Sequence, residues 1–255
     1  MTAITPTNPN TRDEASPADR YLTHAIELIE RLRTAEAANL IAASRLIANT
    51  LIGHHTVHVF GTGHSHMLAE ELFYRAGGLV SVRPLLFEGL MLHSSAPLST
   101  SLERLPGLAE ALLLDHPITA GDVLIVASNS GSNAVTSELV QRVMAEGIPV
   151  IALTSLNHAT SPAARPTNLP RLHELATVVI DNGGCVGDAA VDITGIDTRV
   201  SATSTVVGAA ILNAVMAEAI QLAVNEGVVP DIYESSNTSS GDTTNHKFTS
   251  KGASV

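Results

Sequence analysis

The chain has 255 residues, of which 45% are hydrophobic and only 3% aromatic, and this predicts one large domain with an aliphatic core suited to a buried parallel sheet. A formal net charge of −11 argues against nucleic acids and anionic membranes as partners. The single cysteine, Cys185, excludes an intrachain disulfide, and a polar start without a signal-peptide pattern favours the cytoplasm.

The first elements in chain order are predicted to be helical. We expect residues 1–17 to form a frayed tail. Apolar residues recur at helical spacing over 18–51, which predicts one long helix or two in tandem. Such a helical arm is compatible with packing on a neighbouring subunit and equally with packing inside its own chain. A short buried strand over 56–60 follows, and then a glycine loop over 61–66 and a helix over 67–77.

Strands and helices then alternate along the chain. Four more apolar segments read as strands, at 79–86, 122–127, 149–154 and 177–180. Helices are expected between or after them, at 101–115, 134–146 and 201–226. The segments 156–172 and 182–199 lack periodicity and are expected to be irregular, and residues 227–255 form a polar tail. This alternation predicts a doubly wound, five-stranded parallel α/β sheet within one domain over 18–226.

Two polar loops follow predicted strands and open predicted helices. The loop Ser-Asn-Ser-Gly-Ser-Asn at 128–133 has hydroxyls and a glycine where α/β proteins bind anions. It contains no lysine, so it is not a nucleotide-type phosphate loop. The loop Gly-Thr-Gly-His-Ser-His at 61–66 carries His66 where a dinucleotide fingerprint has its third glycine. Hydroxyls at two strand ends predict one shared phosphate pocket.

These loops resemble those of the sugar isomerase (SIS) domain family. The resemblance extends over about 18–226 and includes Ala-Glu-Glu-Leu-Phe-Tyr-Arg-Ala-Gly-Gly at 69–78, Phe-Glu-Gly at 87–89 and Ser-Ala-Thr-Ser-Thr at 201–205. Together these segments are similar to a little-characterised branch labelled sugar isomerase domain-containing or phosphoheptose isomerase-like. The resemblance implies a flavodoxin-like fold, a sugar phosphate ligand, no metal or other cofactor, and a homodimer or homotetramer with sites near subunit interfaces.

The same resemblance assigns roles to individual residues. Those assigned to the substrate phosphate are Gly63, Ser65, Ser128, Asn129, Ser130, Ser132 and Ser204. Enzymes of this family remove the proton next to a sugar carbonyl, usually with a glutamate. The candidates are Glu70 and Glu71, on the helix after the first loop, and Glu88, after the second strand. Candidate sugar contacts are His64 and His66 beside Ser65, and Asn237 and Asn245 in the polar tail, which would fold over the site.

We therefore expect an enzyme that acts on an (N-acetyl)hexosamine 6-phosphate by abstracting the proton at C2. Two sources of carboxylates favour elimination of water, which would make the protein a sugar-phosphate dehydratase or lyase. Reprotonation at C1 would instead make it an aldose–ketose isomerase. A third reading, from a different class, is a non-catalytic phosphosugar-sensing regulatory module. The sequence lacks a basic helix-turn-helix, which argues against a DNA-binding regulator.

Overall fold

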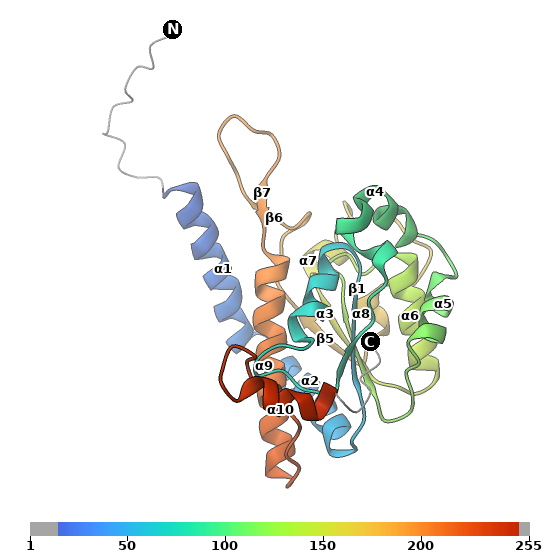
Figure 1. Cartoon of the computed structure of the whole chain (residues 1–255). Helices are drawn as coiled ribbons and strands as arrows, with labels where there is room; N and C mark the ends of the chain where they lie inside the picture. Colours follow the sequence, from blue (N-terminus) through green and yellow to red (C-terminus); the bar gives the residue numbers. More distant parts are fainter. Residues whose placement is uncertain (1–14, 250–255) are drawn as a thin grey trace.

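A computed structural model describes residues 15–249, and at its centre lies a five-stranded parallel sheet (Figure 1). The strands are β1 (Val57–Gly61), β2 (Val82–Pro84), β3 (Val123–Ala127), β4 (Val150–Thr154) and β5 (Val178–Asp181). Their order across the sheet is β2-β1-β3-β4-β5, and β1 and β3 pair along their full length from Val57↔Val123 to Gly61↔Ala127. The predicted α/β class and five-stranded parallel sheet are confirmed.

Helices cover both faces of this sheet (Figure 1). The long helices are α1 (Pro17–Thr34), α2 (Ala37–Ile52), α6 (Ala134–Ala145) and α9 (Ser204–Asn225). The shorter ones are α3 (His66–Leu72), α4 (Leu92–Leu102), α5 (Leu108–Asp115), α7 (Leu156–Ala159), α8 (Leu172–Leu175) and α10 (Gly241–Thr249), with single 3₁₀ turns at Gly63–Ser65 and Glu88–Leu90.

Alternating side chains of each strand divide the core into two halves. On one face, Val59 and Ile125 pack with buried residues of α1, α2, α3 and α9. On the other face, Phe60 and Leu124 pack with buried residues of α5, α6 and α8. Because both faces are covered, the strands carry continuous apolar runs rather than an alternation of apolar and polar residues.

The predicted helical arm packs within its own chain as two helices. α1 and α2 are separated by a break at residues 35–36, and both contact α9. On α1, Leu28 and Leu32 join the core, and Arg31 forms an ion pair of 2.8 Å with Asp181 at the end of β5. α1 nevertheless leaves Leu22 59% exposed.

Strand β2 is shorter than its apolar pattern predicts. Leu79 leaves the parallel sheet and bridges to Ile232 in antiparallel fashion. The backbone on both sides follows the same pairing, since Val80 N donates to Asp231 O at 3.0 Å and Tyr233 N donates to Gly78 O at 2.9 Å. A segment beyond α9 therefore takes the backbone bonds that would have lengthened β2.

Three segments predicted to be irregular or unstructured contain regular elements, and one of them, 156–172, includes the short helix α7. The other two are 182–199 and the segment after α9. In 182–199 lies β6 (Ala189–Val191), which pairs with β7 (Val200–Ala202) as an antiparallel hairpin that stands out from the body of the molecule beside α1 (Figure 1). β7 includes the first two residues of the predicted helix 201–226, which begins as α9 only at Ser204. The segment after α9 forms the β2-flanking bridge and then α10. Residues 1–14 and 250–255 of the two expected tails lie outside the described residues.

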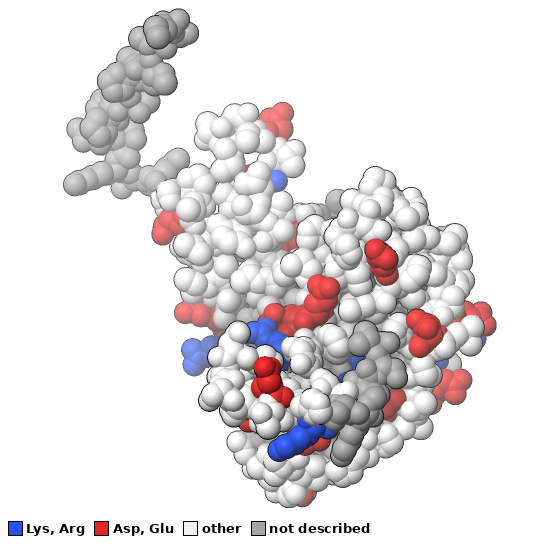
Figure 2. Space-filling model, viewed as in Figure 1, with Lys and Arg blue, Asp and Glu red and all other residues white. Residues whose placement is uncertain are grey.

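The charged residues of the molecule are mainly acidic, and the most apolar of its described long helices is α9. On the face drawn in Figure 2, acidic side chains are scattered and basic ones are few. Among the described helices, α9 alone is long and apolar enough to satisfy a length-and-composition criterion for a membrane span. Its contacts with α1, α2 and α3 make it a core helix of the fold.

Candidate functional site

The two hydroxyl-bearing loops meet at the carboxyl edge of the sheet. Because β1 and β3 are parallel neighbours, the loops that follow them leave the sheet side by side. Between them lies a cavity of about 220 Å³, which we call the serine cavity. It is lined by Thr62, His64, Ser65, Glu103, Ser128, Asn129, Ser130, Asn133, His158, Gly187, Asp188 and Ser204. Four of these residues, Ser65, Ser128, Asn129 and Ser204, also line a small pocket next to it.

Glycine at position 61 brings Ser65 into the cavity. A Cβ atom on Gly61 would lie 2.4 Å from the carbonyl oxygen of Ser65, well inside any real contact distance. Gly63 adopts a left-handed backbone with φ of 57°, which glycine tolerates without the strain that a side chain adds. The chain therefore folds back tightly after β1 and places Ser65 opposite the second loop.

The second loop is organised by its own hydroxyls. Ser128 Oγ accepts a hydrogen bond from Gly131 N at 3.1 Å, and Ser132 Oγ donates to Ser130 Oγ at 3.2 Å. α6 begins directly after Asn133, whose side chain makes no capping bond. In the first turn of this 12-residue helix, Val135 N donates to the carbonyl oxygen of Glu103 at 3.2 Å. The partial positive charge of the helix end, directly after the cavity-lining Asn133, attracts an anion.

Asn129 supplies a further donor at the cavity. Its Oδ1 accepts a hydrogen bond of 2.8 Å from Asn182 Nδ2, which fixes the orientation of the amide. Its Nδ2 is buried and has no hydrogen-bond partner within residues 15–249. An unpaired buried amide is costly, so a ligand oxygen that reached this nitrogen would be favoured.

Asp188 holds the start of α9 in place. The residue has a left-handed backbone with φ of 68°, which is strained for a residue with a side chain. Its carboxylate accepts hydrogen bonds from Thr203 N at 3.2 Å, from Ser204 N at 2.9 Å and from the Ser204 hydroxyl. With three donors engaged, this carboxylate positions Ser204 rather than offering a free base.

Glu103 and His158 are residues of the cavity that sequence reasoning missed. Glu103 Oε2 accepts a hydrogen bond of 2.8 Å from Thr62 Oγ1, so the end of α4 is tied to the first loop. His158 Nδ1 accepts a hydrogen bond of 2.9 Å from Gly187 N, which leaves the ring hydrogen of neutral His158 on Nε2. Neither residue belongs to a local motif, and only the fold brings them to the serine loops.

The structure brings together most of the residues predicted to bind phosphate. Ser65, Ser128, Asn129, Ser130 and Ser204 line the serine cavity, and so does His64 among the predicted sugar contacts. The other three residues predicted to contact the substrate from these loops do not line the cavity. They are Gly63, Ser132 and His66, and they bond within the loops. The ring of His66 bonds to the carbonyl of Gly63, and Ser132 reaches Ser130 as described above.

The three predicted catalytic glutamates do not line the serine cavity. Glu88 is exposed on the 3₁₀ turn after β2. Glu70 is exposed and lies 3.7 Å from the His66 ring. Glu71 accepts a hydrogen bond of 2.9 Å from Asn213 on α9 and pairs with Arg75.

The tail asparagines also lie apart from this cavity. Asn245 is buried, and its amide bonds to the backbone N–H and carbonyl of Glu234 at 3.0 and 2.9 Å. Asn237 is exposed, and its backbone N–H donates to Ser235 Oγ at 3.3 Å. In residues 15–249, no group of three or more His, Cys, Asp or Glu side chains is arranged to hold a metal ion.

Comparison with known proteins identifies the family of this chain. The SIS domain model matches residues 20–155. The UPF0309 protein lin2794 of Listeria innocua is 38% identical over 233 residues, which cover 91% of this chain and 94% of that protein. The UPF0309 protein BCAN_B0929 of Brucella canis is 43% identical over 219 residues, covering 86% and 89%.

Among solved structures, a phosphoheptose isomerase from Francisella tularensis superposes with a TM-score of 0.51 and 15% identity, over 79% of this chain and 95% of that one. At this identity the likeness concerns the fold. The family match shows more than the fold, because it covers more than half of the chain and includes both serine loops and strands β1 to β4. The two UPF0309 relatives are 38% and 43% identical over most of the chain. The chain is therefore a member of the SIS domain family, and its serine cavity lies where the two family loops meet.

Proposed function

We propose that the protein binds a sugar 6-phosphate in the serine cavity and removes the proton at C2. One observation carries the proposal: two hydroxyl-rich loops, the residue that precedes α6 and the side chain of Glu103 line the same cavity. The hydroxyls of Ser65, Ser128 and Ser130, with the N-terminus of α6, suit a phosphate dianion. The cavity is too small for a dinucleotide but matches a single open-chain sugar phosphate.

Glu103 is the carboxylate we assign as the base. It is half-buried, and its bond to Thr62 orients one oxygen while leaving Oε1 without a partner in the described part of the chain. A base that is close and oriented loses less freedom when it meets the substrate. Glu88, Glu70 and Glu71 do not line this cavity, and we assign them no part in the reaction.

The arrangement favours isomerisation, because a single free carboxylate is sufficient for it. Glu103 takes the proton from C2 of the aldose and returns it to C1, while the hydroxyl proton on O2 moves to O1. Elimination of water is the second candidate, and His158 favours it. With its hydrogen on Nε2, this imidazole is a donor in the cavity that can protonate a leaving hydroxide from C3.

Solvent exchange tests the proposal. The protein is incubated in D₂O with a panel of hexose, hexosamine and N-acetylhexosamine 6-phosphates, and NMR follows deuterium at C2 together with ketose or dehydrated products. Glu103→Gln should slow exchange by about 10²–10⁴-fold with binding retained. Glu88→Gln, the matched control, should exchange at the wild-type rate. Saturable binding without exchange would make the protein a phosphosugar-sensing module, and absence of binding would refute the proposal.

The phosphate site has its own test. Ser130→Ala removes one neutral donor and should weaken binding of the active sugar phosphate about 10-fold, the effect expected for a bond to a charged acceptor. The same change should leave the affinity for the corresponding sugar without phosphate unaltered. An equal loss for both sugars would place the phosphate elsewhere.

A further inference from the structure

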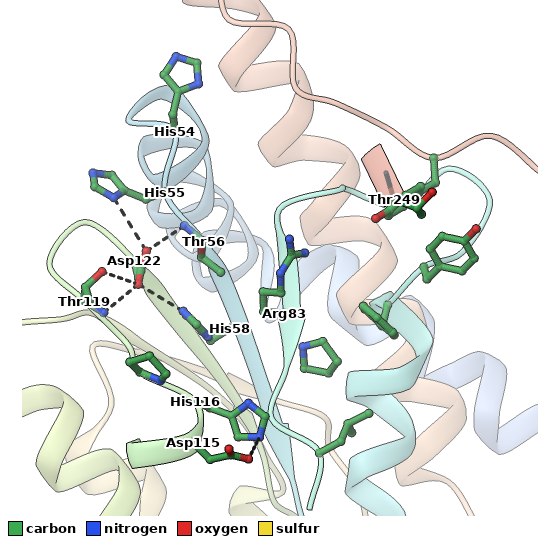
Figure 3. Close-up of a pocket in the computed structure, with 16 residues that line it drawn as sticks. His54, His55, Thr56, His58, Arg83, Asp115, His116, Thr119, Asp122 and Thr249 are labelled. Atoms are coloured by element: carbon green, nitrogen blue, oxygen red, sulfur yellow. Dashed lines mark hydrogen bonds and ion pairs between the residues drawn. The ribbon is translucent and has the colours of Figure 1, made fainter. Parts of the chain in front are cut away.

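A second and larger cavity lies at the opposite end of the sheet. It has a volume of about 900 Å³ and opens beside the amino ends of β1 and β3, whereas the serine loops follow their carboxyl ends. Figure 3 shows the side chains that line it, many of which come from the α2–β1 turn, from β1 and β2, and from the loop before β3. We call it the histidine cavity because His54, His55, His58 and His116 line it.

Arg83 provides the positive charge of this cavity. Its guanidinium is held in place by hydrogen bonds from Nη1 to Val80 O at 2.7 Å and to Val82 O at 2.9 Å. Its Nε and Nη2 have no hydrogen-bond partner, and no carboxylate lies within ion-pair distance, as far as residues 15–249 are concerned. In Figure 3 Arg83 lies between His58 and Thr249. A fixed guanidinium with a free edge is suited to a carboxylate or phosphate.

The acidic residues of the histidine cavity do not neutralise Arg83. Asp122 is buried and accepts hydrogen bonds from Thr56 N at 2.9 Å and from Thr119 N at 2.8 Å, with His58 Nε2 at 3.3 Å. Asp115 has an 84% exposed side chain beside His116. The carboxylate of Asp122 is thus engaged by other donors and Asp115 is exposed, which leaves Arg83 without a carboxylate partner among the described residues.

Aromatic side chains also line the cavity. Tyr74, which is 48% exposed, has a left-handed backbone with φ of 45°, an arrangement that costs energy for a residue with a large side chain. In that conformation its ring meets the ring of Tyr233 edge to face, with 4.8 Å between centroids. Phe73 is a further lining residue, 6.4 Å from Tyr74. A strained residue that presents a ring to a cavity indicates a recognition surface.

We propose that the histidine cavity is a second binding site, for a small organic anion that carries a planar aromatic group. The anionic group binds the free edge of Arg83, and the imidazoles of His58 and His116 lie beside it. The planar group packs against Tyr74 and Phe73. The site is independent of the sugar phosphate proposed for the serine cavity, because the two cavities share no lining residue.

Benzoate is the probe for this site, with two matched ligands that each remove one feature. Benzamide keeps the ring and the shape but lacks the charge, and cyclohexanecarboxylate keeps the charge but lacks the aromatic ring. A titration followed by the imidazole NMR signals should give saturable binding of benzoate. Benzamide and cyclohexanecarboxylate should each bind at least about tenfold more weakly. Equal binding of all three, or no saturation by benzoate, would overturn the proposal.

Variants locate the binding. Arg83→Gln should weaken benzoate about 10–100-fold, as expected for loss of a charged hydrogen-bonded pair. Tyr74→Gly removes the ring at a position whose backbone suits glycine, so it also tests the site if the Arg83 variant does not fold. Ser130→Ala in the serine cavity should leave benzoate binding unchanged. If Ser130→Ala lost benzoate binding while Arg83→Gln and Tyr74→Gly retained it, benzoate would bind in the serine cavity. That result would refute the proposed second site without contradicting the sugar phosphate site.

Discussion

Replacing Asp122 by alanine removes the acceptor that joins the amino ends of β1 and β3. The carboxylate accepts hydrogen bonds of 2.8–3.3 Å from Thr56 N, Thr119 N, Thr119 Oγ1 and His58 Nε2. Burial by itself acts to raise the pKa of Asp122, but the donors from Thr119 and Thr56 and the nearby His58 lower it on balance. Because the pKa of Asp122 is lowered on balance, the folded protein favours the ionised carboxylate.

The size of the effect depends on which donors water can satisfy afterwards. Thr119 is exposed, so water replaces the carboxylate there and little free energy is lost. Thr56 N is half-buried and the His58 side chain is 8% exposed, so both donors lose a charged acceptor with poor access to water. Charged hydrogen bonds contribute about 1.5–3 kcal/mol each, and the regained hydration of Asp122 offsets part of that. We expect Asp122→Ala to lower the free energy of unfolding by about 2–4 kcal/mol.

Urea unfolding followed by circular dichroism at pH 7 measures this change, and thermal unfolding should show a fall in Tm of about 5–15 °C. The matched control is Thr119→Ala, which removes only the water-replaceable hydroxyl and should cost less than about 0.5 kcal/mol. The difference between Asp122→Ala and wild type should shrink as the pH falls through the lowered pKa of Asp122, below its ordinary value of 3.8. A cost below about 0.5 kcal/mol for Asp122→Ala, or an equal cost for both variants, would refute the reasoning.

Three further outcomes are expected from single changes. Gly61→Ala should lower the free energy of unfolding by about 1–3 kcal/mol and weaken sugar phosphate binding, because its Cβ would collide with Ser65. The control is Gly107→Ala, where φ is 85° and the space is open, and it should lower stability without changing binding. Calorimetry measures both the stability and the binding. Burial lowers the pKa of His58, although the nearby Asp122 acts to raise it, so the free energy of unfolding should fall as the pH drops below 6.5. His58→Gln should flatten this pH dependence by up to about 1.4 kcal/mol per pH unit, as measured by urea unfolding at several pH values. An unchanged pH dependence would contradict the expectation. Leu212→Ala, on the buried face of α9, should lower the free energy of unfolding by about 2–5 kcal/mol in urea unfolding. A cost no larger than that of a surface leucine substitution would contradict the packing described.

The sheet and the phosphate loops were predictable because their signals are local. A buried strand such as 123–127 is an uninterrupted apolar run, and the serine loop follows it within the next six residues. Parallel pairing of β1 with β3 then brings two loops from distant parts of the sequence to one edge. Local pattern and sheet topology together were sufficient to place Ser65 near Ser128.

Other parts of the site depend on contacts that no local pattern reveals. Glu103 reaches the cavity only because α4 folds back from β2 and ends beside Thr62. Asp188 lies in a segment without periodicity, and its role arises from a left-handed turn and from donors 15 and 16 residues away. The sequence pattern favoured Glu88 because it follows a strand, but the chain turns there into an exposed 3₁₀ turn.

The backbone pairing beside β2 has a consequence for the solubility of the chain. Edge strands with unpaired N–H and C=O groups are templates for pairing with another molecule. Here Gly77 N donates to Tyr233 O at 2.8 Å, and Val80 and Gly78 bond to the same returning segment. Residues 231–233 thus occupy part of the border where a foreign strand would add. The polar stretch after α9 therefore occupies, with its own main-chain atoms, N–H and C=O groups next to β2 that another strand could otherwise pair with.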